Sequence, residues 1–439
     1  MTQQRSENLV RGIGVRQLTA SIVNATIGAG IFVVPALVAQ GLGAAAPVAY
    51  VICAATMALL VTTFAMAGSR VTQTGGLFAY VEVAFGPYVG FLAGTLQWLS
   101  SLFGAGGVAI ALMDALGAVA PALHAPAARL AALTLTLMTF AWINSRGVQT
   151  GARTIEVMTI AKIAPILCFV IVGIFAVQPA SLAWPGTPSV PAIGRAVLLL
   201  SFAFIGIELA LTPSGEVHRP AQSVPRAIYL ALAITASLYI AIQLVAQGVL
   251  GAGLATSTEA PLADAARRFL GGAGATLMLA GMLVSMLGYL SGDALCTPRN
   301  IYAFARDGFI PAVFGRVHPV SRAPRVAIWT HAALVFAVAN SGSFQSVAIV
   351  ANVATFALYL MAAVASLRLV RRDVRGDGPP FVVPGATIIA LLAIAAVIGI
   401  LASATAKEFG ATGIALAIAS LLYRWRRKPD PAPPLAPVG

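Results

Sequence analysis

The chain has 439 residues, of which 59% are hydrophobic and only 9% are charged. Its mean hydropathy is +0.91, whereas roughly a quarter of the residues of a soluble domain are charged. This composition excludes an ordinary soluble domain and predicts an integral, all-α membrane protein. The three cysteines, Cys53, Cys168 and Cys296, lie far apart without CxxC spacing, so we expect no disulfide framework, metal site or cofactor.

Apolar runs long enough to cross a bilayer recur along the whole chain. A spanning helix needs about 20 predominantly apolar residues, and about twelve runs meet this requirement. We therefore expect twelve membrane helices, at roughly 15–40, 44–69, 87–117, 129–145, 153–177, 191–212, 226–250, 272–304, 324–341, 345–370, 384–403 and 410–425. The first run is too long for a signal peptide and is expected to remain as a permanent span.

The net charge of +13 would suit a nucleic-acid partner, but its placement indicates membrane topology instead. With the N-terminus inside, most of the 27 lysines and arginines fall in cytoplasmic loops and tails, as the positive-inside rule requires. The exceptions are one lysine within a span, Lys162, and five outer residues, Arg129, Arg195, Arg267, Arg268 and Lys407. We expect a multi-pass protein of the cytoplasmic membrane, with both termini inside, that contacts anionic lipid and not nucleic acid.

The first predicted helix contains a stretch that is easily broken. NATIGAGIFVVP, at 24–35, carries Gly28 and Gly30 two residues apart and Pro35 one turn further on. Non-helical backbone is tolerated at membrane depth only where it is buried in protein or lines a cavity. The simpler interpretation is that the glycines let another helix approach closely, but small residues in a packing motif are usually four apart.

A second interruption is expected in the sixth helix, where Gly206 and Glu208 lie near the middle and Pro213 follows. Interrupted helices at corresponding positions of two halves are the best sequence indication of a transporter site. Five helices in each half would place the halves in opposite orientation. The predicted units are an N-terminal tail (1–14), two inverted repeats (15–177 and 191–372), two accessory helices (384–426) and a Pro-rich C-terminal tail (427–439).

Paired interruptions favour one kind of ligand. Freed N–H groups at the start of a half-helix can hold an anion, and freed carbonyls can hold a cation. A molecule with a carboxylate and an ammonium on one carbon fits both, so the pattern predicts an α-amino acid.

Three ordered motifs resemble the amino acid-polyamine-organocation (APC) superfamily of permeases. They are GAGIFVVP, FAFIGIE followed by GEVHRPAQSVPRAI, and PRNIYAFARDGFIP, and the similarity extends from about residue 12 to 425. The resemblance implies a LeuT-like fold of five plus five inverted helices, with helices 1 and 6 broken. It also implies secondary active transport of amino acids by alternating access.

The resemblance assigns roles to residues at both interruptions. Ile27, Gly28, Ala29 and Gly30 would receive the substrate carboxylate. The carbonyls of Phe202, Ala203 and Ile205, next to Gly206, would receive the ammonium, and Phe202 would close over the ligand. Ser100 and Ser101 of the third helix are small where the substrate side chain would project.

Charged residues within the membrane are functional candidates, because each costs at least about 2.5–3.5 kcal/mol at the centre of a span. Glu208 either takes up a proton or tethers the unwound segment to its neighbours. Asp293, in the eighth helix, either contacts a cationic substrate or pairs with a polar group on a neighbouring helix. Arg299, near the cytoplasmic end of that helix, is expected to belong to an inner gate.

Lys162 lies about two turns into the fifth helix among apolar residues. An ammonium so far from water needs carbonyl or carboxylate partners, unless its stem snorkels to the surface. In sodium-independent members of the resembling family, a lysine at this place fills the position of a sodium ion. By that resemblance Lys162 contacts carbonyls around Ile27 and Gly28, and transport needs no sodium and draws on protons or on exchange.

Two other classes of membrane protein, an enzyme and a channel, are the alternatives to a permease. An enzyme would need a catalytic constellation, but the histidines His124, His218, His318 and His331 are scattered. A channel would need a repeated pore lining, which the sequence lacks. We therefore expect a non-enzymatic amino acid permease. The alternative is a transporter of cationic amino acids or polyamines, which requires Asp293 to face the substrate.

Overall fold

The computed structural model describes residues 14–71, 76–146, 162–184, 186–208, 211, 217–319, 321, 323–376 and 379–425. The predicted C-terminal tail, most of the N-terminal tail and Pro213 lie outside these residues. Within them there is no β-strand, and six helical stretches are long and apolar enough to cross a membrane. A seventh is added if the bent pair of helices at the C-terminal end of the described chain counts as one span. The protein is therefore an all-helical membrane protein.

The labelled helices follow one another along nearly the whole described chain. They are α1 (Val15–Thr26), α2 (Gly30–Leu42), α3 (Ala46–Gly68), α4 (Leu77–Phe85), α5 (Pro87–Val119), α6 (Pro126–Ser145), α8 (Val190–Leu200), α9 (Pro220–Leu250), α10 (Pro261–Cys296), α11 (Pro298–Arg306), α12 (Arg325–Ala339), α13 (Phe344–Arg371), α14 (Ala386–Leu401) and α15 (Ala406–Trp425). Another apolar helix, Lys162–Ala176, lies between α6 and α8.

Two regions differ from the predicted spans. α4 has only nine residues, too few to cross a membrane, so a search for spans omits it. The predicted span 272–304 is divided at Thr297, because Pro298 has no N–H with which to continue α10 and instead begins α11. α10 also begins earlier than predicted, at Pro261, and turns sharply at Gly271.

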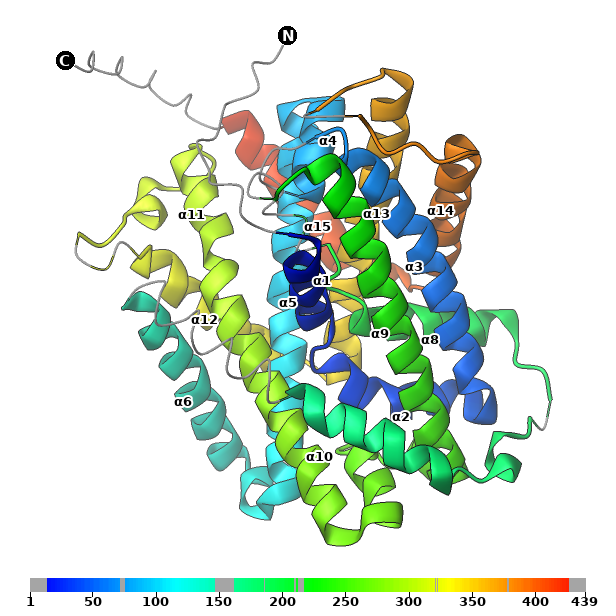
Figure 1. Cartoon of the computed structure of the whole chain (residues 1–439). Coiled ribbons are helices and arrows are strands. Elements are labelled where there is room, and N and C mark those ends of the chain that lie inside the picture. Colours follow the sequence, from blue (N-terminus) through cyan, green and yellow to red (C-terminus); the bar gives the residue numbers. More distant parts are fainter. Residues whose placement is uncertain are drawn as a thin grey trace.

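α5 is the central helix of the bundle, and Figure 1 shows other helices around it. It packs against α13, α10, α12, α4 and α15, while α9 packs against α3 and α1, and α2 against α8. α4 and α11 lie toward one end of the bundle in Figure 1, and the turn η2 (Pro121–His124) lies at the opposite end. These are called the α4 end and the η2 end below.

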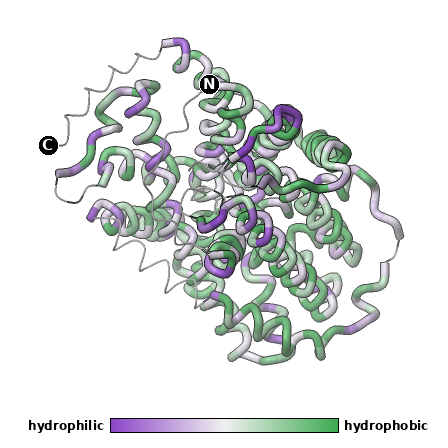
Figure 2. Tube along the Cα trace, turned by 45° about the horizontal axis from the view of Figure 1, so that its top comes forward, coloured by the Kyte–Doolittle hydropathy of each residue, from purple (hydrophilic) through white to green (hydrophobic). Residues whose placement is uncertain are grey.

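The helices carry apolar side chains outward as well as inward. Figure 2 shows that hydrophobic residues predominate along the helices and that hydrophilic stretches are short. Leu135, Phe175, Ile388 and Ile414 are large apolar side chains that are exposed. A soluble protein rarely exposes so much apolar surface, so this exterior is suited to lipid.

The chain leaves helical geometry at the two places where the sequence predicts broken helices. α1 ends at Thr26 and α2 begins at Gly30, with a bend over the three residues between them. α8 ends at Leu200 and passes through the short turn η5 (Ser201–Ala203) into further turns that reach Glu208.

The two interruptions touch each other backbone to backbone, and glycine permits the contact. A Cβ atom on Gly30 would lie 2.9 Å from Cα of Ala203. A Cβ atom on Gly206 would lie 2.6 Å from the carbonyl oxygen of Ala25, and Gly206 has a φ of +112°, which side chains rarely adopt. The two unwound segments therefore cross at a distance that only glycine allows.

Gly206→Ala is expected to destabilise the protein by about 1–3 kcal/mol, because it adds both a clash and a strained backbone conformation. Thermal unfolding of the purified protein in detergent measures the effect. Gly41→Ala is the matched control, since nothing lies within 4 Å of its new Cβ atom. Equal unfolding temperatures for the two variants would contradict the close crossing.

Candidate functional site

A small cavity lies between α5, α10, α13 and the second interruption. Its volume is about 20 Å³, which is room for a water molecule and not for an amino acid. Five of its lining residues are ones proposed from the sequence, namely Ser100, Ser101, Ile205, Gly206 and Glu208. The other four are Gln97, Tyr289, Thr355 and Leu358. We call this space the central cavity.

The first interruption lies next to the central cavity and is joined to it by Tyr289. A Cβ atom on Gly28 would lie 3.5 Å from the ring of Tyr289, and one on Gly104 would lie 2.9 Å from its hydroxyl. Ile27 and Ala29 are buried, and Gly28 N–H donates to the carbonyl of Thr26 at 2.8 Å. The N–H of Phe32 donates to the carbonyl of Ala29 at 3.1 Å, whereas the N–H groups of Gly30 and Ile31, at the start of α2, have no acceptor within their own helix.

Lys162 reaches the carbonyls that the first interruption frees. Its Nζ atom donates to the carbonyl of Ile27 at 2.6 Å and to that of Asn24 at 2.8 Å. Only 7% of the residue is exposed, so the ammonium is held inside the bundle and does not snorkel to water. From the sequence we expected Lys162 to contact carbonyls around Ile27 and Gly28. Its acceptors are the carbonyl of Ile27 and, in place of that of Gly28, the carbonyl of Asn24, about one turn earlier.

Tyr239 of α9 links the two interruptions. Its hydroxyl lies 2.8 Å from the carbonyl of Thr26 and 2.9 Å from that of Ala203. With one proton, the hydroxyl can donate to only one of them at a time. The sequence analysis missed Tyr239, since a tyrosine in an apolar helix is an ordinary core residue until its hydroxyl partners are known.

Glu208 is bound within the second interruption. Its Oε2 atom accepts from the Tyr359 hydroxyl at 2.6 Å and from the backbone N–H of Gly206 at 3.1 Å. The residue is 6% exposed and still lines the central cavity. Glu208 therefore tethers the unwound segment to α13 and also faces the central cavity.

Phe202 and Ala203 lie in η5, at the start of the second interruption. The Phe202 ring meets that of Phe344 edge-on at 5.2 Å, and its tip would lie 3.7 Å from a Cβ atom on Gly107. Both residues are buried. Phe202 therefore lies between α5 and α13 in this structure, beside the interruption.

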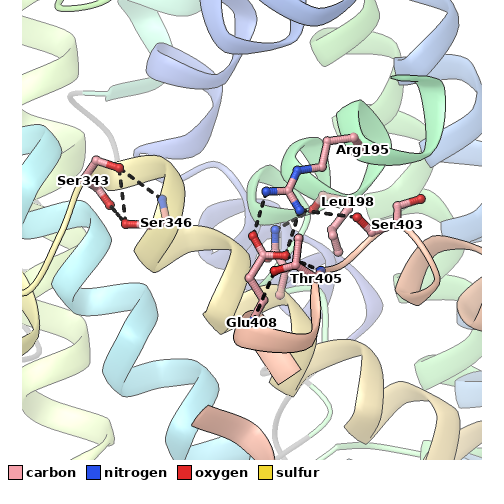
Figure 3. Close-up of polar contacts among 8 residues, drawn as sticks. Arg195, Leu198, Ser343, Ser346, Ser403, Thr405 and Glu408 are labelled. Carbon is pink, nitrogen blue, oxygen red and sulfur yellow. Dashed lines mark hydrogen bonds and ion pairs between the residues drawn. The ribbon is translucent and has the colours of Figure 1, made fainter. Parts of the chain in front are cut away.

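The half-helix α8 is held to α15 and α13 by side-chain contacts, part of which Figure 3 shows. At the middle of α8, Arg195 makes two hydrogen bonds to the Glu408 carboxylate of α15, at 2.8 and 2.7 Å. Near its C-terminal end, the Asn352 amide of α13 donates to the carbonyl of Leu198 at 2.6 Å. These contacts hold α8 in position where its helix stops.

Two further residues proposed from the sequence, Asp293 and Arg299, do not line the central cavity. Asp293 is paired with His331 of α12 at 2.6 Å and accepts from Thr297 at 2.6 Å. It lines a separate small space against α6 and α12. Arg299 is half-buried on α11 and does not line the central cavity. Of the two interpretations of Asp293, the structure therefore agrees with the second, in which the residue pairs with a polar group on a neighbouring helix.

In the part of the chain that the structure describes, no three His, Cys, Asp or Glu residues gather in a way that could hold a metal ion. The groups available for hydrogen bonding at the interruptions are backbone groups, the hydroxyls of Tyr239 and Tyr359, the ammonium of Lys162 and the carboxyl group of Glu208.

Known proteins match almost the entire chain. The family model described as amino acid permease matches residues 13–435. A methylthioribose transporter of Bacillus subtilis is 28% identical over 84% of this chain and 83% of its own length. A serine/threonine exchanger of the same organism is 27% identical over 93% and 94%, and an arginine/agmatine antiporter of Chlamydia abortus is 27% identical over 74% and 70%.

The family match covers the span in which both interruptions, Lys162 and Glu208 lie. The chain belongs to the amino acid permease family.

Proposed function

We propose that the protein is a secondary active permease that moves amino acids across the cytoplasmic membrane by alternating access, with no enzymatic activity. Its fold would be the LeuT-like arrangement of twelve spans, with the two repeats, the accessory helices and the cytoplasmic termini as expected from the sequence. The observation that carries the proposal is the backbone contact between two interrupted helices, at Gly30 with Ala203 and at Gly206 with Ala25.

The proposed ligand position follows from the backbone groups at this contact. The carboxylate would lie at the first N–H groups of α2, where Ala29 and Gly30 open the helix and its dipole is positive. The ammonium would lie at the carbonyls of Phe202, Ala203 and Ile205. The Ala203 carbonyl already lies near Tyr239, and its second lone pair is available to a ligand.

The substrate side chain would project toward Ser100 and Ser101, where the central cavity begins. We favour a neutral amino acid, because Asp293 is engaged by His331 and lies apart from this cavity. A cationic amino acid or polyamine is the second candidate, since one relative is an arginine/agmatine antiporter.

Counterflow in proteoliposomes tests this function. Vesicles loaded with one unlabelled amino acid are expected to accumulate the labelled form transiently, because a carrier couples entry of one molecule to exit of another. A panel of neutral and cationic amino acids, with and without a pH gradient, identifies the substrate and the driving force. Uptake that is linear in concentration and shows no counterflow would indicate a channel and contradict the proposal.

Lys162 is proposed to replace a sodium ion at the first interruption, since its ammonium already occupies the carbonyls of Asn24 and Ile27. Wild-type uptake is therefore expected to be unchanged in sodium-free buffer, and Lys162→Ala is expected to lose at least about tenfold in rate, because two buried carbonyls lose their donor. Lys407→Ala, a lysine of the described chain at the start of α15, is the control. A strict sodium requirement, or full activity of Lys162→Ala, would refute the assignment.

A further inference from the structure

A larger cavity opens at the α4 end, between α4, α5 and α11. Its volume is about 390 Å³, within the range of small-molecule sites. Its lining includes four phenylalanines, Phe78, Phe91, Phe304 and Phe309, and three charged side chains, Glu82, Arg306 and Asp307. We call it the α4 vestibule.

The α4 vestibule adjoins the central cavity through one side chain. Gln97 lines both spaces. Its amide oxygen is buried and has no hydrogen-bond partner among the described residues, an unusual condition for a buried polar atom. A ligand or water passing between the two spaces would meet this amide.

The walls of the vestibule are aromatic. Phe91 stacks on Phe309 with ring centroids 3.9 Å apart and meets Phe304 edge-on at 5.3 Å. Gly94, on the same helix face, leaves space, since its nearest contact for an added Cβ atom is the Phe304 ring at 3.8 Å. Faces of aromatic rings carry negative charge density and attract cations.

Glu82 is the unpaired acid of this cavity. Among the residues that the structure describes it has no ion pair, whereas Asp307 is paired with Arg306 at 2.9 Å. Gly90 fixes its place, because a Cβ atom there would lie 2.6 Å from Cβ of Glu82. Partial desolvation, and secondly the Asp307 carboxylate, raise the pKa of the Glu82 carboxyl.

We propose that the α4 vestibule binds a compact organic ammonium ion, with its charge against Glu82 and its apolar part against the phenylalanine rings. The proposal extends the proposed function, because such a site lies beside the central cavity and would receive a substrate's ammonium group on the way in or out. Binding itself does not depend on transport.

Equilibrium dialysis of radiolabelled tetraethylammonium against the purified full-length protein tests the site. We expect saturable binding that Glu82→Gln weakens about fivefold or more, the equivalent of losing one partly desolvated ion contact. Phe304→Leu should also weaken it, while Phe304→Tyr, which keeps the aromatic face, should not. Asp373→Asn is the control, since Asp373 is an exposed acid just beyond α13 that does not line the vestibule.

Equal binding by wild type and Glu82→Gln would overturn the proposal, as would an equal loss in Asp373→Asn, which would indicate general surface charge. The result is separable from that of the counterflow assay. Glu82-dependent binding without counterflow would leave the vestibule site standing and remove the transport function. Counterflow without Glu82-dependent binding would support the transport function and remove the vestibule site.

Discussion

The structure depends on one constraint, that two helices stop within the bundle and cross through their bare backbone. Gly30 and Gly206 allow a separation that any side chain would prevent. Where each helix ends, backbone N–H and C=O groups lose their helical hydrogen bonds, and no water is available to replace them at membrane depth. Each such group left without a hydrogen-bond partner costs several kcal/mol. This cost explains the polar side chains that contact the two interruptions.

Three side chains meet the freed groups, each from a different helix. Lys162 donates to Asn24 and Ile27, Tyr239 lies between Thr26 and Ala203, and Asn352 donates to Leu198. The N–H groups of Gly30 and Ile31, at the start of α2, need an acceptor that the helix itself does not provide. In the proposed function, a substrate carboxylate supplies this acceptor.

The sequence predicted the places of the interruptions because glycine spacing reports directly on backbone freedom. It also predicted that Lys162 needs buried partners, since a lysine in an apolar run has few other solutions. It did not predict Tyr239, Asn352 or the vestibule with Glu82. Those depend on which helices face one another; α4 is too short to be recognised as a span, and most of α11 falls within the predicted span 272–304. For Asp293 the sequence allows two interpretations, because it does not say that His331 lies opposite.

The most direct test of the site is whether an amino acid stabilises the protein through the first interruption. At a hundred times its dissociation constant a ligand adds about 2.7 kcal/mol of stability, which raises the unfolding temperature of the purified protein. The Gly28→Leu variant should fold, because a Cβ atom at residue 28 would lie at an ordinary contact distance of 3.5 Å from the Tyr289 ring. The rest of the leucine side chain would fill the position proposed for the substrate carboxylate. The account predicts that a transported amino acid stabilises the wild type more than Gly28→Leu, and that the corresponding amine without a carboxylate stabilises the two proteins equally. Equal stabilisation of both proteins by the amino acid would contradict it.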